Sequence, residues 1–121
     1  MFTGLIIRES IPSDIILTEL GLKVAKTEEW YIGERAAEFQ PTTWNAIFIE
    51  GSEQEIDEIA GKLSQTILPR WYANISDATT EYVIFHEKIF KHIKGDKADA
   101  AEAISYGRSI GIPEHQLDWV R

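Results

Sequence analysis

The three histidines are the side chains best suited to hold a metal ion or to transfer a proton at neutral pH, but their spacing favours neither role. They are His86, His92 and His115. No pair has the short spacing of metal ligands on one element, and the chain has no cysteine. In the hairpin expected below, His86 lies in the turn and His92 at the far end of a strand. We therefore expect no metal site and no cofactor.

Catalytic arrangements built on serine, or on histidine with glutamate, are equally weak in this sequence. Ser76, Ser105 and Ser109 stand in no Gly-x-Ser-x-Gly context, and no glycine-rich phosphate-binding motif is present. His86 and Glu87 could combine a base with an acid, but adjacent residues of a strand face opposite sides. A histidine in a surface turn is the favoured interpretation, and binding is favoured over catalysis.

A small basic cluster follows these residues and consists of Lys88, Lys91, His92, Lys94 and Lys97. Alternation along a strand places Lys91 on the opposite face from Lys88 and His92, which divides the cluster. The pattern favours lysines that solvate the edge of a hairpin and prevent sheet-to-sheet association. A site for an anion or an acidic partner is the alternative.

The aromatic residues are the most informative feature, since four tryptophans are many for 121 residues. The aromatic side chains concentrate on three expected strands and one loop: Trp30, Tyr31, Phe39, Trp44, Trp71 and Tyr72. Alternation should place one ring of the pairs Trp30–Tyr31 and Trp71–Tyr72 on each face of a sheet. If helices cover one face, the other must be covered by the C-terminal hairpin and helix, by a second subunit or by a ligand.

Charged side chains near these rings suggest what such a ligand would meet. Arg35 or Arg70 could clamp a carboxylate or stack on a ring, and Glu34 could act as an acid or base. The alternative is an intramolecular pair between Glu34 and an arginine at the end of the sheet. The candidate ligand-binding set is Trp30, Glu34, Arg35, Trp44, Arg70 and Trp71.

The elements that position these side chains predict an α+β fold. Strands are expected at 2–8, 22–32, 44–50, 70–75, 82–85 and 89–93, and helices at 12–20, 56–67 and 97–110. The middle helix is the best determined, because Ser52 and Glu55 form a capping box ahead of a regular apolar stripe. The stripe consists of Ile56, Ile59, Ala60, Leu63 and Ile67.

The order of these elements predicts a ferredoxin-like βαββαβ core followed by a β-hairpin and a helix. Residues 1–121 form one domain, with the core at 1–75 and the hairpin–helix extension at 76–121. Right-handed crossovers would place both core helices on one face of an antiparallel sheet. The tail carries Leu117 and Trp119, which should pack back onto the domain.

Composition narrows the class of protein further. The net charge is −8; the first 60 residues hold 12 acids and 4 bases, and the rest hold 8 of each. Negative charge disfavours nucleic-acid binding. No apolar run is long enough for a membrane helix, and the N-terminus does not resemble a secretory signal. Together with the lack of cysteine, this predicts a cytoplasmic protein.

Three stretches of the C-terminal third also carry a resemblance. They are Arg70–Ala73, Tyr82–Phe85 with Ile89–Lys91, and Tyr106–Trp119. In these stretches the chain resembles small bacterial proteins of unknown function. The resemblance implies that the tail belongs to the fold, and it carries no activity.

Three functional interpretations follow from the sequence. The leading one is a noncatalytic binding or protein-interaction module, which would self-associate as a homodimer through a face or edge of its sheet. The second is a small-molecule-binding protein or small enzyme, with a pocket lined by Trp30, Arg35, Trp44 and Trp71. The third is an acidic inhibitor or immunity-type protein that binds a basic partner through the charge of the first half.

Overall fold

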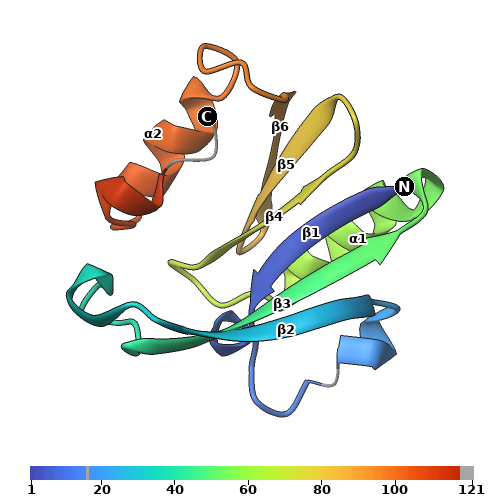
Figure 1. Ribbon diagram of the computed structural model, residues 1–121. Coiled ribbons are helices and arrows are strands. Elements are labelled where there is room, and N and C mark those ends of the chain that lie inside the picture. The colour runs from blue at the N-terminus through green and yellow to red at the C-terminus, as the bar shows by residue number, and fades with distance from the viewer. Residues whose placement is uncertain (16, 118–121) are drawn as a thin grey trace.

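The structure is a computed structural model that describes residues 1–15 and 17–117. In this part of the chain six strands form one antiparallel sheet, and two α-helices lie on its opposite sides (Figure 1). The strands are β1 (Phe2–Ile7), β2 (Lys23–Tyr31), β3 (Thr43–Gly51), β4 (Tyr72–Ser76), β5 (Thr80–Phe85) and β6 (Lys88–Ile93). The helices are α1 (Ile56–Thr66) and α2 (Ala101–Ser109), and neither is long and apolar enough to cross a membrane. The predicted α+β class is confirmed.

The finer prediction of a ferredoxin-like βαββαβ core is not confirmed. The sheet has the order β2-β3-β1-β4-β5-β6, so the C-terminal hairpin extends it beyond β4 to six strands. The described residues between β1 and β2 form only two 3-10 turns, Arg8–Ser10 and Leu17–Leu20, where the sequence predicts a helix at 12–20. The first helix of the predicted pattern is therefore missing from the described part of the chain.

Arg8 gives the physical reason for this wrong prediction. Its guanidinium donates hydrogen bonds to the carbonyl oxygens of Ile11 (3.0 Å), Pro12 (3.3 Å), Ser13 (3.3 Å) and Ile15 (2.9 Å). An α-helix would use these carbonyl groups for its own backbone hydrogen bonds. A side chain outside the segment thus satisfies the backbone in an irregular conformation, which the local pattern of apolar residues does not reveal.

Helix α1 is confirmed and packs as its sequence predicts, but the predicted capping box is wrong: the Ser52 hydroxyl donates to the Glu55 carboxylate (2.9 Å), and neither side chain caps the helix backbone. All five residues of its apolar stripe are buried against the sheet. The β5–β6 turn is fixed to this helix, because the Glu87 backbone N–H donates to the Ser64 carbonyl (2.9 Å) and the Ser64 hydroxyl donates to the Phe85 carbonyl (2.9 Å). This anchoring stabilises a turn in which Glu87 has a φ of 58° without the usual Asn or Gly.

The two faces of the sheet differ in how fully they are covered. The α1 face, which includes Ile6, Ile49 and Ile84, is buried by α1 together with the irregular residues 8–15 and 17–22. On the other side, the α2 face, α2 packs only on the β4–β6 side, where Ala103 contacts the cluster of Val83 and Phe85. We call the part of the α2 face over β1, β2 and β3 the open half.

Candidate functional site

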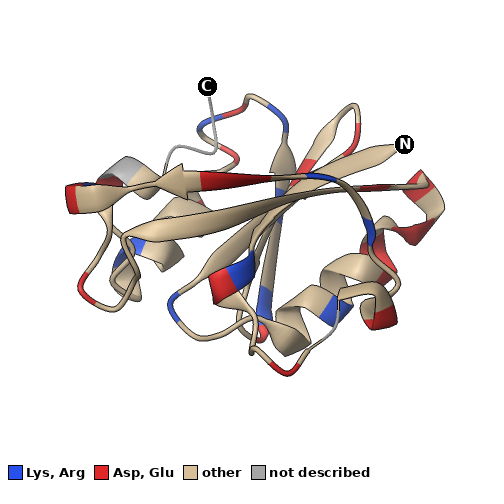
Figure 2. Ribbon diagram, turned by 60° about the horizontal axis from the view of Figure 1, so that its bottom comes forward, with Lys and Arg blue, Asp and Glu red and all other residues tan. Residues whose placement is uncertain are grey.

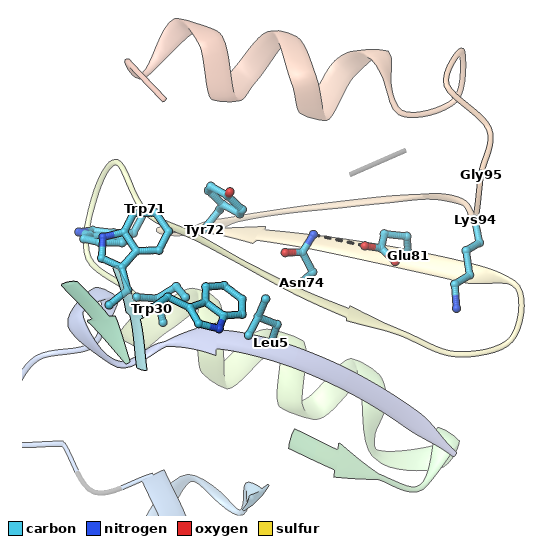
Figure 3. A pocket seen from close by; sticks show the side chains of 10 residues that line it. Leu5, Trp30, Trp71, Tyr72, Asn74, Glu81, Lys94 and Gly95 are labelled. Carbon is cyan, nitrogen blue, oxygen red and sulfur yellow. Dashed lines mark hydrogen bonds between the residues drawn. The ribbon is translucent and has the colours of Figure 1, made fainter. Parts of the chain in front are cut away.

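A cleft of about 530 Å³ lies where the open half meets the region under α2 (Figure 3). Every strand except β6 contributes at least one of its side chains, and the chain after β6 closes one end. The lining residues are Leu5, Ile7, Trp30, Trp44, Trp71, Tyr72, Asn74, Glu81, Lys94 and Gly95. In Figure 3 the aromatic rings lie toward one end and the charged side chains toward the other, so the cleft is amphipathic along its length.

The aromatic end of the cleft is built mainly from three tryptophans. Trp44 and Trp71 meet edge to face with ring centroids 5.3 Å apart, and both are buried. The indole N–H of Trp44 donates to the Pro41 carbonyl (2.9 Å), and that of Trp30 donates to Glu28 (3.0 Å). These bonds hold the Trp30 and Trp44 rings by their edges, and the half-buried Trp30 leaves aromatic surface for an apolar group.

The polar end combines an amide, a carboxylate and an ammonium group. Asn74 Nδ2 donates to Glu81 Oε1 (3.2 Å), and Lys94 Nζ donates to the Asp77 carbonyl (3.3 Å). Burial raises the pKa of the Glu81 carboxyl above its ordinary value; the Asn74 hydrogen bond and the charges of His92 and Lys94 lower it by less. Within the described chain Glu81 forms no ion pair, so its charge is poorly compensated.

His92 lies on β6 directly opposite Glu81 in the strand register. Its side chain is 3% exposed, and neither ring nitrogen has a hydrogen-bond partner among the described residues. An unsatisfied polar group in a buried position costs about 1–3 kcal/mol. Glu81 in the cleft and the buried His92 ring opposite it in the register therefore each carry a desolvation cost that lowers the stability of the fold.

The six predicted ligand-binding residues divide into two equal groups. Trp30, Trp44 and Trp71 line the cleft, whereas the three charged residues do not. Arg70 stacks on the Phe39 ring at 4.4 Å, which is one of the two roles suggested for it. Arg35 is exposed, and its carbonyl accepts a hydrogen bond from Gln116 Nε2 (3.2 Å).

Glu34, the third charged residue, is exposed in the 3-10 turn Gly33–Arg35 that follows β2. The intramolecular pair suggested for it with Arg35 or Arg70 is not among the ion pairs of the described chain. A ligand in the cleft would therefore meet none of the three predicted charges.

The expected alternation of aromatic pairs holds for one pair and fails for the other. Trp30 lines the cleft while Tyr31, on the opposite face, is 76% exposed. Trp71 and Tyr72, by contrast, both line the cleft. Because β4 begins only at Tyr72 and Arg70 has a φ of 69°, Trp71 precedes the extended chain and escapes its alternation.

Sequence reasoning missed the polar end, which consists of Asn74, Glu81 and Lys94. One signal was available. Asn74 is a polar residue inside a predicted strand, and Glu81 immediately precedes the apolar run of the next strand. Both residues are half-buried on adjacent strands, where the register places them near one another.

The histidines and lysines of the β5–β6 hairpin do not gather into a second site. His86 is half-buried in the turn, where Nδ1 lies 2.8 Å from the Ile67 carbonyl, far along the strand from His92. Lys91 pairs with Asp57 (3.1 Å) on the α1 face, so the basic cluster is divided as predicted. The described residues include no group of three His, Asp or Glu side chains that could hold a metal ion.

Comparison with known proteins adds no relative to this picture. The chain matches no protein-family model, no curated protein significantly matches its sequence, and no solved structure significantly matches its fold. The resemblance of the C-terminal third to small bacterial proteins stays an expectation, and the functional argument depends on the cleft.

Proposed function

We propose that this protein is a binding module whose cleft takes a small organic molecule with a flat apolar part and a polar end. The observation that carries the proposal is the amphipathic lining, with three tryptophans at one end and Asn74, Glu81 and Lys94 at the other. Clefts of several hundred Å³ with apolar walls and a few polar groups are typical of small-molecule sites. Glu81 and His92 also fit a site whose residues are kept at a cost in stability.

Binding is favoured over catalysis by the chemistry of the lining. The side chains that line the cleft include no serine, threonine or histidine, so a hydroxyl nucleophile activated by a histidine base is absent from the lining. Glu81 is the one carboxylate of the lining, and the ring nitrogens of the histidine opposite it are buried. The function that these groups support is recognition of a ligand by shape and charge.

Self-association is the second candidate, and a second hollow on the open half supports it. This hollow has a volume of about 440 Å³ and is continuous with the cleft through Leu5 and Asn74, with Phe48 on its wall. A second copy could cover this face. Pairing through the β2 edge is disfavoured, because that strand is exposed and carries four charged residues, Lys23, Lys26, Glu28 and Glu29.

Size-exclusion chromatography with light scattering separates these two candidates. A monomer at high micromolar concentration would leave the homodimer without support and the cleft accessible to small molecules. A dimer that Phe48→Glu dissociates would show that a second copy covers the open half.

The acidic-inhibitor interpretation is the least favoured of the three. Aspartate and glutamate are spread along β2 and around α1 rather than gathered in one patch (Figure 2). Several of them already form ion pairs with neighbouring lysines, including Lys26–Glu28, Lys23–Glu50 and Lys62–Glu58. A charged surface that keeps the domain in solution accounts for this pattern.

The proposed function is tested by NMR with a neutral aromatic alcohol, 3-phenylpropan-1-ol, at millimolar concentration. We expect the indole N–H signals of Trp30, Trp44 and Trp71 to shift on addition, because these rings form the aromatic end. Trp30→Ala should weaken the interaction several-fold, whereas Tyr31→Ala, its exposed neighbour, is the matched control and should not. The absence of any shift at these signals would overturn the proposal.

Two finer sequence predictions remain proposals. The relation of β1–β4 to a ferredoxin-like core is supported by the antiparallel pairing of these four strands. The 3-10 turns between β1 and β2 weigh against it. The cytoplasmic location is supported only by the composition of the chain.

A further inference from the structure

Two opposite charges line the polar end of the cleft without neutralising one another. Glu81 accepts a hydrogen bond from Asn74, and Lys94 donates one to a backbone carbonyl, but the two side chains form no ion pair with each other. Elsewhere in the molecule opposite charges that share a surface do pair, as Lys91 does with Asp57. The separation at the cleft leaves an acidic and a basic position open to a ligand.

The order of groups along the cleft adds a second constraint. In Figure 3 the tryptophans lie at one end, Asn74 and Glu81 follow, and Lys94 lies beyond them. A ligand with its ring among the tryptophans would therefore bring its polar end to both charged side chains. A cationic ligand would leave Lys94 uncompensated, and an anionic ligand would do the same to Glu81.

We propose that the cleft binds a free aromatic amino acid, or a close analogue, as a zwitterion. The ring lies among Trp30, Trp44 and Trp71, the ammonium group pairs with Glu81, and the carboxylate pairs with Lys94. The inference rests on the proposed function and specifies its ligand class. The partial burial of Glu81 strengthens its interaction with a ligand ammonium group, and that pairing would offset the cost of burying the carboxylate.

The test uses the full chain and four probes that share one ring: L-phenylalanine, phenethylamine, 3-phenylpropionate and 3-phenylpropan-1-ol. Isothermal titration calorimetry measures each affinity. L-Phenylalanine should bind about tenfold more tightly than the amine, which lacks the carboxylate, or the acid, which lacks the ammonium group. The neutral alcohol reports the apolar contacts alone.

Two substitutions assign the charges to their partners. Glu81→Gln should abolish the preference for L-phenylalanine over 3-phenylpropionate, and Lys94→Gln should abolish its preference over phenethylamine. Lys97→Gln, an exposed lysine outside the lining, is the matched control and should change neither preference. Thermal unfolding of each variant confirms that it is folded.

The possible outcomes show whether the inference fails alone or together with the proposed function. If all four probes bind with equal affinity, the zwitterion is overturned while small-molecule binding stands. If phenethylamine or 3-phenylpropionate equals L-phenylalanine, the pairing with Lys94 or with Glu81, respectively, is overturned. If none of the four binds, both proposals are overturned.

Discussion

Leu5 and Ile6 are adjacent on β1, yet they lie in two very different environments. Ile6 is fully buried on the α1 face, where α1 and the residues 8–15 and 17–22 exclude water. Leu5 is only half-buried on the α2 face and lines the cleft. Both residues are large and aliphatic, so burial here depends on what covers the strand rather than on the strand's own sequence.

The helices that cover the two faces, α1 and α2, present different kinds of residue to the sheet. Helix α1 presents a regular stripe of large aliphatic residues, whereas α2 buries small residues such as Ala103 and Gly107. A helix with small contact residues can approach the sheet closely, but it spans only the β4–β6 side. The comparison teaches that the α1 face holds the larger buried cluster, while the described residues leave the open half available as a binding surface.

The largest expected effect on stability comes from truncating one leucine on the α1 face and comparing it with one leucine on the α2 face. Leu63→Ala, at a fully buried position of α1, should lower the free energy of unfolding by about 2–5 kcal/mol. Leu5→Ala in the half-open cleft should cost about 1 kcal/mol, because the site is already in contact with solvent. Urea denaturation of both variants measures the difference. Equal costs would contradict the distinction between the two faces.

The next largest effect on stability is expected from substitutions that enlarge a side chain on β1. A Cβ on Gly4 would lie 2.3 Å from Ile75 Cγ2 and 2.9 Å from the Asn74 carbonyl oxygen, so Gly4→Ala should cost about 1–3 kcal/mol. Leu5→Phe, one residue along, extends into the cleft and should cost less than about 1 kcal/mol. The same substitution should weaken binding of 3-phenylpropan-1-ol. Unchanged binding would show that the probe lies elsewhere.

Sequence reasoning predicted the α1 face better than the site on the other face. The stripe of α1 and the strands it covers have regular spacing, and regular spacing is what local patterns reveal. The wrong helix at 12–20 has a different cause: the Arg8 guanidinium binds the carbonyls of that segment, and hydrogen bonds of this kind have no periodicity.

The candidate site was predicted at its aromatic end and missed at its polar end. Trp30, Trp44 and Trp71 stand out by residue type alone, although Trp71 points into the cleft only because it precedes β4. Glu81 and Lys94 look like ordinary surface charges in the sequence. Strand register and the chain after β6 bring them together, and neither can be inferred from local spacing.

A smaller effect is expected under α2, where the covered part of this face holds an unsatisfied polar group. His92→Leu replaces a buried ring, whose two nitrogens have no hydrogen-bond partner in the described part of the chain, with an apolar side chain. The variant should be more stable by about 1 kcal/mol at neutral pH, because the desolvation cost of the imidazole is removed. Chemical denaturation measures the change. A loss of more than about 1 kcal/mol would show that the imidazole makes a stabilising interaction.

The smallest expected effect concerns Glu81 and depends on pH. Its pKa in the folded state is raised by burial, so folding favours the protonated carboxyl. The stability that this preference contributes is complete below the ordinary pKa of 4.5 and is lost as the pH rises through the folded-state pKa. Glu81→Gln, which cannot ionise, should therefore match the natural chain at about pH 4 and exceed it by about 0.5 kcal/mol at about pH 7.

Urea denaturation at the two pH values tests this prediction. The charged and titratable groups that face Glu81 are His92 on β6 and Lys94, and both remain in the variant. Because both groups are present in both proteins, the difference between the two curves isolates the carboxyl. If the two proteins differed in stability by the same amount at both pH values, the folded state would not disfavour ionisation of Glu81. The cleft would then impose no desolvation cost that distinguishes Glu81 from an ordinary surface carboxylate.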